Sequence, residues 1–353
     1  MKSVLRLLLK SQHQRNRSGP AQTDKGMTLV ELLVGSIMAF LIITPMLGFV
    51  VDMLNTDRRE QVKSNTEQDI QAAVDFIAQD LSQAIYIYDK KGIEAIKPQL
   101  PANDTNQIPI LVFWKRQQIK NSVPINSTIP PQDCTLPPNT AKCNDTYVLS
   151  LVAYYQFKDN EATWCQPSGE PCPTRIARYE IRDGVRKPDP VATDNNLPYY
   201  NVSDTTLAQQ PDSAFNKEFD FSKPTEKVTL LGLSGTTTPV TPPTQQVLVN
   251  YIDHSTPNPP TLSPTECQTA LGNPTDPKDT TKFLDDTTLK VTDTEGRNSF
   301  YACVDTARNI ARVTIRGNSL RRLQANGADF KTTSSAYFPT ASVQVQGRGA
   351  QAQ

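Results

Sequence analysis

The sequence has few of the residues on which most catalytic sites depend. It contains two histidines in 353 residues, His13 and His254, and shows no P-loop, no Gly-x-Ser-x-Gly and no His-Glu-x-x-His pattern. His13 falls in the basic N-terminal segment, which leaves His254 as the one imidazole in the rest of the chain. We expect His254 at the end of a strand, where a surface position is more common than a catalytic one. The sequence therefore argues against an enzyme.

An excess of one charge sign is also missing. Lys and Arg total 36 and Asp and Glu total 36, a balance that does not favour a nucleic-acid binder. The balance hides an asymmetry along the chain. Residues 1–26 carry six basic side chains against Asp24 alone, so their net charge is +5, and the remainder of the chain carries −5. The positive charge therefore precedes the one strongly apolar segment.

That apolar segment, residues 27–51, contains a single charged side chain, Glu31. A helix of this length is about 37 Å long, enough to cross a hydrocarbon core of roughly 30 Å. The positive-inside rule then predicts a single-pass protein of the inner (plasma) membrane, with residues 1–26 in the cytoplasm and the head periplasmic or extracellular. An ordinary signal peptide fits less well, because the apolar run is too long and no small-x-small cleavage motif follows it.

Cysteine is absent from the first 133 residues, and all six cysteines lie in the part predicted to be exported: Cys134, Cys143, Cys165, Cys172, Cys267 and Cys303. An even number in an oxidising compartment predicts disulfides, although six cysteines allow fifteen connectivities. Pairing of neighbours is the preferred arrangement, joining the first two, the next two and the last two. A zinc site is the rival interpretation, but no Cys-x-x-Cys spacing supports it.

Proline is absent between residues 46 and 97, whereas 26 of the 28 prolines follow residue 97. The proline-free stretch predicts that the membrane helix continues as an amphipathic extension over residues 52–90. An apolar stripe at three- and four-residue steps supports this extension: Ile70, Ala73, Val74, Ile77, Leu81, Ala84, Ile85 and Tyr88. One helix from Met27 to Tyr88 would be roughly 93 Å long.

From residue 91 to residue 353 the pattern changes to short β-type runs between polar, Pro-rich connections such as 188–198 and 236–244. The expected strands are 110–114, 147–157, 175–182, 228–233, 246–252, 299–304, 311–316 and 341–346. The predicted fold is therefore α+β, with a long N-terminal helix packed on an antiparallel β-sheet head that carries long Pro-rich loops.

The junction between leader and apolar run carries the most specific motif, Gly26-Met27-Thr-Leu-Val-Glu31, preceded by Lys25. It closely resembles the cleavage signal of type IV pilins and type II secretion pseudopilins. The resemblance implies that a prepilin peptidase cuts after Gly26 and methylates the new amino group of Met27. It also places Glu31 at the fifth mature position, where that family carries glutamate. The chain departs from the family by having Met27 where phenylalanine is usual.

The physical chemistry of Glu31 agrees with this resemblance. An ionised side chain within a spanning helix costs on the order of 3 kcal/mol, so it normally has a partner. The new amino group of Met27 in an adjacent subunit would pair with Glu31 and set the register of assembly. The alternative is a carboxylate that snorkels to the interface or takes up a proton. Further along, Pro45 and Gly48 mark a kink at which the helix bends or melts during assembly, or a static kink without function.

The helix end QDIQAAVDFIAQDLSQAIY and the segment ARVTIRGNSLRR resemble the minor-pilin group that includes the PilW and type II secretion J-type subunits. The Pro-rich head and the Gly-Arg-Gly ending resemble the pseudopilins of cyanobacterial hormogonium polysaccharide secretion. The resemblance implies a minor pseudopilin at the tip or initiating complex of a filament, acting in polysaccharide secretion and gliding motility. The implied partners are prepilin peptidase, other pilins and pseudopilins, and the inner-membrane assembly platform with its ATPase.

Several alternatives stay open at this point. The head can be a pilus-tip adhesin or a polysaccharide-binding module, or the chain can be a minor subunit of a protein-secreting type II system. The acidic stretch 285–295 can bind calcium as a cofactor, although its spacing matches no EF-hand and a solvated loop is the preferred interpretation. A basic cluster can contact an anionic polymer or simply form a charged outer sheet face: Arg312, Arg316, Arg321 and Arg322.

Overall fold

The structure is a computed structural model that describes residues 28–101, 106–126, 134, 139–158, 160–187, 199, 210–216, 243–255, 263–291 and 298–351. The chain divides into two compact units, Met1–Arg58 and Arg59–Gln353. The long helix α2 (Leu29–Leu81) contributes its first part to the first unit and its second part to the second unit. Each unit is described separately below.

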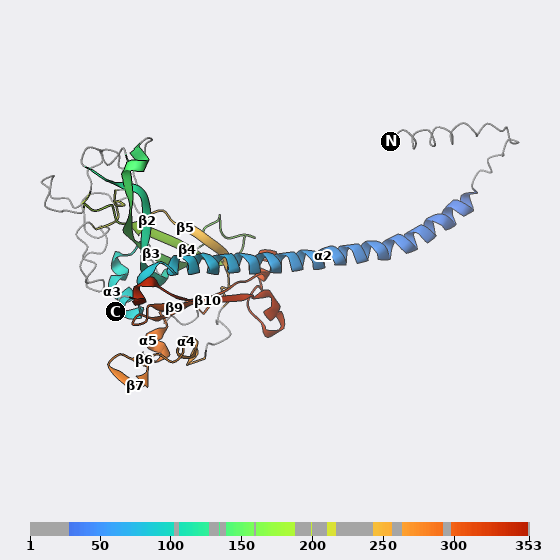
Figure 1. The fold of residues 1–353 in the computed structure, drawn as a ribbon. Coiled ribbons are helices and arrows are strands. Elements are labelled where there is room, and N and C mark those ends of the chain that lie inside the picture. The colour runs from blue at the N-terminus through green and yellow to red at the C-terminus, as the bar shows by residue number, and fades with distance from the viewer. Residues whose placement is uncertain are drawn as a thin grey trace, which may run out of the picture. The chain divides into compact units, whose positions relative to one another are not determined.

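The described part of the first unit is helical (Figure 1). Its sequence is apolar on all sides of the helix. Its large hydrophobic side chains are exposed, from Leu29 at 83% to Val34 at 48%. By length and composition α2 is long and apolar enough to cross a membrane. This agrees with the predicted transmembrane helix over residues 27–51.

The second part of α2 buries one stripe in the head: Thr66, Ile70, Ala73, Val74, Ile77, Asp80 and Leu81. The predicted amphipathic extension is therefore present, but its predicted end at Tyr88 to residue 90 is wrong. The helix ends at Leu81, and residues 84–87 form the strand β1 (Ala84–Ile87). Ala84 and Ile87 are fully buried in that strand, so the apolar stripe is real and only its helical geometry was misassigned.

A five-stranded antiparallel sheet forms the larger layer of the head, in the order β1-β2-β3-β4-β5. Its other strands are β2 (Gln107–Pro124), β3 (Cys143–Phe157), β4 (Thr174–Arg182) and β5 (Gln246–Ile252). In the central register Trp114 lies opposite Leu151, and Leu151 lies opposite Ile181. These rows of buried apolar side chains form the main core of the head.

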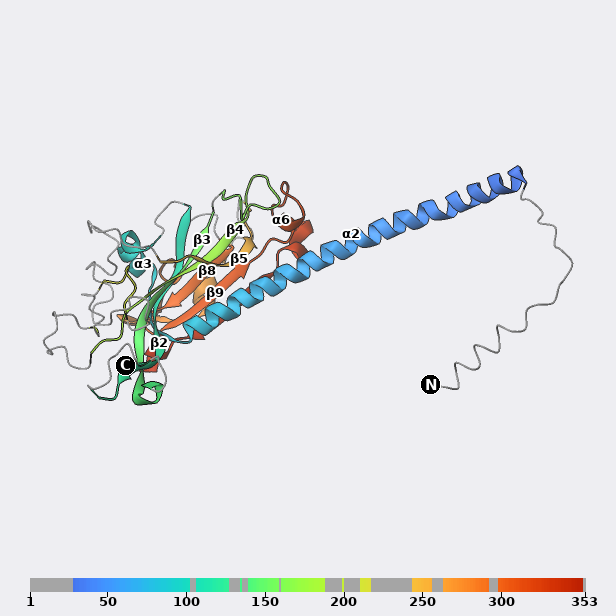
Figure 2. The ribbon, with the colours of Figure 1, turned by 90° about the horizontal axis from the view of Figure 1, so that it is seen from above.

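A three-stranded antiparallel sheet forms the second layer, in the order β10-β9-β8. It consists of β8 (Phe300–Asp305), β9 (Ile310–Arg316) and β10 (Thr340–Gln346). A bridge between Ile252 and Gly317 joins the two sheets at the ends of β5 and β9. Figure 2 shows the second part of α2 running alongside strands of both sheets, so the helix packs on a combined surface.

Short elements fill the remaining described parts of the head. The helices are α3 (Lys90–Ile96), α4 (Glu266–Ala270), α5 (Asp286–Leu289) and α6 (Leu320–Leu323). The 3-10 turns are η1 (Lys97–Gln99), η3 (Asn139–Lys142), η4 (Thr332–Tyr337) and η5 (Arg348–Gln351). The hairpin β6 (Thr275–Asp276) and β7 (Asp279–Phe283) is a separate two-stranded sheet.

The predicted α+β class is confirmed at the level of a long N-terminal helix and antiparallel sheets. Seven of the eight predicted strands correspond to β2, β3, β4, β5, β8, β9 and β10, whereas 228–233 lies outside the described residues. The strands β1, β6 and β7 were not predicted. Most of the two Pro-rich connections, 188–198 and 236–244, also lies outside the described residues, so their structure stays a prediction.

The head contains three disulfides, Cys134–Cys143, Cys165–Cys172 and Cys267–Cys303. They join the cysteines that neighbour pairing favours, and they use all six sulfurs of the chain. The third disulfide connects α4 to β8 inside a small satellite core with Leu271, Leu289 and Tyr301. It thereby attaches the α4–α5 region to the three-stranded sheet.

Candidate functional site

The predicted processing site borders the start of α2. Gly26 and Met27 lie outside the described residues, which begin at Thr28, and the helix begins at Leu29. Thr28 Oγ1 accepts a hydrogen bond from the backbone N–H of Glu31 at 3.3 Å, and the Thr28 carbonyl accepts one from Leu32 N–H at 3.1 Å. Thr28 is therefore the N-cap residue, and any cut after Gly26 would fall two residues before the first helical residue.

Glu31 differs from the other polar side chains of the apolar segment. The hydroxyls of Ser36 and Thr44 both donate to carbonyls within the helix, to Leu33 O at 2.8 Å and to Phe40 O at 2.8 Å. Among the described residues the exposed Glu31 carboxylate accepts no hydrogen bond. In lipid a charged side chain of this kind requires a partner.

The position of Glu31 also suits the start of a helix. Glu31 is the third helical residue, three positions after the capping threonine, which is the spacing of a capping box. A carboxylate in the first turn also interacts favourably with the helix dipole. This second role for Glu31 was missed in the sequence, although the Thr-x-x-Glu pattern is its ordinary signal.

The predicted kink region contains no break in the helix. The helix α2 continues through Pro45 and Gly48 without interruption. Pro45 has no N–H, so the carbonyl of Leu41 lacks its usual helical donor, and the Thr44 hydroxyl bond to Phe40 lies in the same turn. An added Cβ at Gly48 would meet no atom within 4 Å, so packing within this chain does not require glycine there. A bend or melting of this turn during assembly stays a prediction.

At the other end of α2 a buried ion cluster holds the helix to the five-stranded sheet. The Asp80 carboxylate accepts bonds from Lys115 Nζ at 2.9 Å, Arg178 Nε at 2.7 Å and Tyr154 Oη at 2.7 Å. Glu180 completes the cluster, with Oε2 at 2.6 Å from an Arg178 guanidinium nitrogen. Burial by itself would raise the pKa of Asp80, but Lys115 and Arg178 outweigh it and hold the pKa below its ordinary value.

The expectation that His254 is a surface loop residue is wrong. His254 is 5% exposed, and this burial lowers its pKa, although the neighbouring Asp253 acts in the opposite direction. Ser255 Oγ donates to Asp253 at 2.5 Å and accepts from the Phe330 N–H at 2.7 Å, so it is engaged away from the imidazole. These residues therefore form no nucleophile–base pair in the described part of the head.

The basic cluster is also placed differently from the expected charged outer face. Arg316 is 6% exposed and pairs with Asp253 at 3.0 Å, and Arg321 is fully buried. The Arg321 guanidinium donates to the carbonyls of Pro167, Gly169 and Pro171 at 2.8, 2.7 and 3.0 Å. It thereby organises the loop closed by the second disulfide. These two arginines are structural and cannot contact a polymer.

The acidic stretch considered for calcium is partly committed to local structure. Asp285 Oδ1 accepts from the Thr288 N–H and from two hydroxyls at the start of α5. Asp286 accepts from the backbone N–H groups of Cys267 and Gln268 at 2.9 and 2.8 Å. Residues 292–297 lie outside the described part. Within the described residues no three metal-ligating side chains come together.

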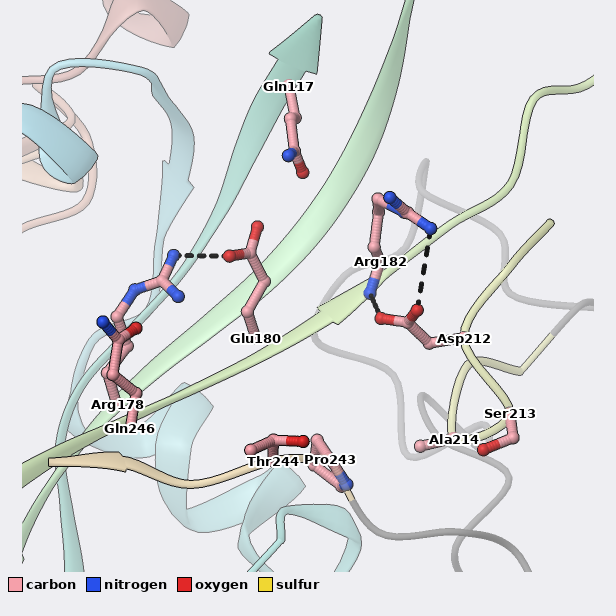
Figure 3. A pocket seen from close by; sticks show the side chains of 10 residues that line it. All are labelled: Gln117, Arg178, Glu180, Arg182, Asp212, Ser213, Ala214, Pro243, Thr244 and Gln246. Carbon is pink, nitrogen blue, oxygen red and sulfur yellow. Dashed lines mark hydrogen bonds and ion pairs between the residues drawn. The ribbon is translucent and has the colours of Figure 1, made fainter. Parts of the chain in front are cut away.

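A cavity of about 430 Å³ opens in the described part of the head, on the five-stranded sheet beside the ion cluster, and Arg178 and Glu180 of that cluster line it (Figure 3). Its lining comes from β2, from β4, from residues 212–214 and from the start of β5: Gln117, Arg178, Glu180, Arg182, Asp212, Ser213, Ala214, Pro243, Thr244 and Gln246. Figure 3 shows Arg178 paired with Glu180 and Arg182 paired with Asp212. None of these residues was singled out in the sequence.

Two regions of the described chain can therefore carry a function, the exposed apolar helix with its single carboxylate and the polar cavity of the head. Comparison of the chain with protein-family models, with curated proteins and with solved structures found no match.

Proposed function

We propose that the chain is a minor pseudopilin, a structural and non-catalytic subunit of a type IV pilus-like or type II secretion-like filament. The observation that carries this proposal is the first part of α2, in which an exposed apolar surface contains, close to its start, one carboxylate that has no partner among the described residues. A solvated monomer rarely exposes an apolar surface of this extent, so the surface requires lipid or other apolar helices as its environment.

A filament subunit meets both environments in turn, first lipid and then the helices of other subunits. Before assembly the helix would cross the inner membrane, with residues 1–26 in the cytoplasm and the head outside. During assembly the same surface would pack among the helices of neighbouring pilins, driven by an assembly platform and its ATPase. The second part of α2 supports this difference in role between the two parts of the helix, because its buried stripe packs against the subunit's own head.

We further propose, from sequence resemblance, a place at the filament tip or initiating complex and a role in polysaccharide secretion and gliding motility. A minor subunit of a protein-secreting system would use the same helix and differ in its cargo. The bulk of the head supports a place where few copies are needed. Residues Arg59–Gln353 form one large compact unit, which is costly to repeat along a thin fibre.

Proteolytic processing tests the class of protein. We expect the mature protein in cells to begin at an N-methylated Met27, detected by mass spectrometry of its N-terminal peptide. Gly26→Leu should leave the leader attached, because a bulky residue would replace glycine at the bond to be cut. Gly35→Leu, in the same helix, is the matched control and should be processed normally, since a Cβ there meets no atom within 4 Å. A wild-type chain that keeps residues 1–26, or a Gly26→Leu chain that still begins at Met27, would contradict the proposal.

A further inference from the structure

The cavity lies where two segments, β5 and residues 212–214, adjoin the same edge of β4. The strand β5 pairs with β4 only from Thr174 to Arg178. Beyond Arg178, Asp212 bonds to this edge of β4 in place of β5. Its N–H donates to Arg182 O at 3.0 Å, and its carboxylate accepts from Arg182 N–H at 2.7 Å. The cavity lies between the start of β5 and residues 212–214, so backbone pairing on both sides fixes its width.

The walls of this cavity are polar. Arg178, Glu180 and Arg182 alternate along β4, so their side chains share one face of the sheet. Amide and hydroxyl groups surround them: Gln117, Ser213, Thr244 and Gln246. Among the described residues of the lining, only Ala214 and Pro243 are apolar and none is aromatic. The volume lies within the range of about 300–1,000 Å³ that is typical of small-molecule sites, but the walls do not suit an apolar or a stacking ligand.

The charges of the cavity cancel. Arg178 is paired with Glu180 at 2.6 Å, and Arg182 lies 3.8 Å from Asp212. Behind these pairs Lys115 and Asp80 neutralise each other at 2.9 Å. A phosphate or another small anion would therefore find no surplus of positive charge, and a cation would find no surplus of negative charge.

Hydrogen-bonding groups of the lining are nevertheless available to a ligand, chiefly the amides and hydroxyls of Gln117, Ser213, Thr244 and Gln246. Arg182 Nε and Glu180 Oε1 are both buried and make no hydrogen bond with any described residue. Glu180 Oε1 lies 3.2 Å from Lys115 Nζ, close enough for attraction but without the geometry of a hydrogen bond. Both atoms are closed to solvent, so a ligand would meet the exposed parts of the two side chains, 24% of Glu180 and 22% of Arg182, next to four neutral polar side chains.

We propose that this cavity binds a neutral, hydroxyl-rich ligand, a saccharide unit. A sugar hydroxyl both donates and accepts, so neighbouring hydroxyls can use a guanidinium and a carboxylate at the same time. A neutral polyol leaves the two ion pairs intact, whereas an anion would compete with Glu180 and Asp212 for the arginines. This site goes beyond the proposed filament role and does not depend on it.

Binding is tested with the full chain in lipid nanodiscs, because many detergents carry sugar headgroups. The probes are glucose, galactose, maltose and cellobiose at millimolar concentration, with inorganic phosphate as the anionic comparison, all followed by saturation-transfer NMR. We expect at least one saccharide to bind and phosphate not to bind. Gln246→Ala should weaken that binding about fivefold by removing one hydrogen-bonding group, and Thr244→Trp should abolish it by filling the cavity.

Gln344→Ala, an exposed glutamine on β10 outside the cavity, is the matched control and should bind normally. No binding of any saccharide, binding of phosphate alone, or saccharide binding unchanged in both cavity variants would each overturn the proposal. Glu31→Leu leaves the cavity untouched, so this variant should still bind saccharide even where it fails to assemble. Failure of the cavity and failure of the filament proposal are thereby distinguished.

Discussion

At the scale of single residues, the most consequential side chain of the head is Asp80. It is 7% exposed in the last turn of α2, and it receives bonds from β2, β3 and β4. A buried ion cluster of this kind need not stabilise more than an apolar contact would, but removal of one partner leaves the others unpaired and buried. Asp80 therefore fixes where the helix meets the sheet.

We predict that Asp80→Asn lowers the free energy of unfolding by about 3–5 kcal/mol at neutral pH, because Lys115 and Arg178 lose their shared counter-charge. The folded-state pKa of Asp80 is lowered, so its stabilisation is present above the ordinary Asp pKa and is lost as the pH falls through the lowered value. The Asn variant should therefore lose less stability than the wild type on acidification. Denaturant unfolding of the full chain, followed by the fluorescence of the buried Trp114, measures both effects.

Asp279→Asn provides the control for this experiment. Asp279 also has a lowered pKa, caused mainly by the Thr281 hydroxyl and Lys282, but it is the first residue of β7, in the separate β6–β7 hairpin, and lies at the surface. Because its partners are exposed to solvent, its replacement should shift the unfolding curve at neutral pH far less than Asp80→Asn does. An Asp80→Asn protein as stable as the wild type, or one with the same loss on acidification, would show that the cluster does not hold the helix.

The buried charged residues could not be found from the sequence. Asp80 is one polar residue beside an apolar stripe, and its partners follow 35, 74 and 98 positions later. No local period relates these positions, since strand pairing alone brings them together. The same limit explains Arg321, whose carbonyl acceptors precede it by about 150 residues. The apolar stripe was predictable because its period is local.

At the scale of elements, α2 packs on the three-stranded sheet through one close approach. A Cβ added at Gly317, just after β9, would lie 2.3 Å from Ile70 Cδ1 and 2.9 Å from Thr66 Cγ2. Glycine is needed there because the helix side chains occupy the space of any larger residue. Two further contacts lie along the same part of α2. Asp69 pairs with Arg322, and Lys63 Nζ lies 4.6 Å from the centroid of the Tyr337 ring.

We predict that Gly317→Ala destabilises the head by about 1–3 kcal/mol, the usual cost of overpacking. Ile70→Val removes the terminal methyl that the new Cβ would meet and should alone cost about 1 kcal/mol. The double variant should then be more stable than the sum of the two single effects requires. The free energies of unfolding of the four proteins give this coupling directly. Additive effects within about 0.3 kcal/mol would mean that the helix does not approach β9 at this residue.

The element boundaries show what periodicity can and cannot predict. The strands 246–252 and 311–316 were found because each is a short run rich in apolar residues with turn-forming residues on both sides. The end of α2 was misplaced because Ala84, Ile85 and Tyr88 continue the helical spacing by coincidence. The residue types were the better guide, since the run Ile85-Tyr-Ile-Tyr88 consists of β-branched and aromatic side chains that favour strands.

At the scale of the whole molecule, the chain has one helix with two different tasks. Before Thr66 no described residue of α2 is buried, whereas from Thr66 to Leu81 one stripe is buried in the head. The sequence predicted this division from the position of charges and prolines. The sequence could not separate the two roles of Glu31, because helix capping and charge pairing both favour a glutamate at this position.

The substitutions Glu31→Gln and Glu31→Leu separate those two roles. Gln keeps the hydrogen-bonding capacity of a capping box but not the charge, and Leu keeps neither. Under the filament proposal, the amino group of Met27 needs a charged partner only after the leader has been removed. Both variants should therefore be cleaved normally. Both should then enter filaments less efficiently than the wild type, on the order of tenfold for a lost pairing energy of about 1.4 kcal/mol. The fraction of cleaved subunit in sheared filaments, compared with that in membranes, measures this loss.

Asp52→Asn, an exposed acid of the same helix just beyond the apolar run, is the matched control and should assemble like the wild type. The pattern of the two Glu31 variants decides the mechanism. If Leu fails and Gln assembles normally, Glu31 acts by capping the helix and charge pairing is excluded. If both variants assemble normally, the lone carboxylate has no role in assembly, and the observation that carries the filament proposal is lost. If both accumulate in the membrane after cleavage, the charge itself is required, because shape and hydrogen bonding are preserved in the Gln variant.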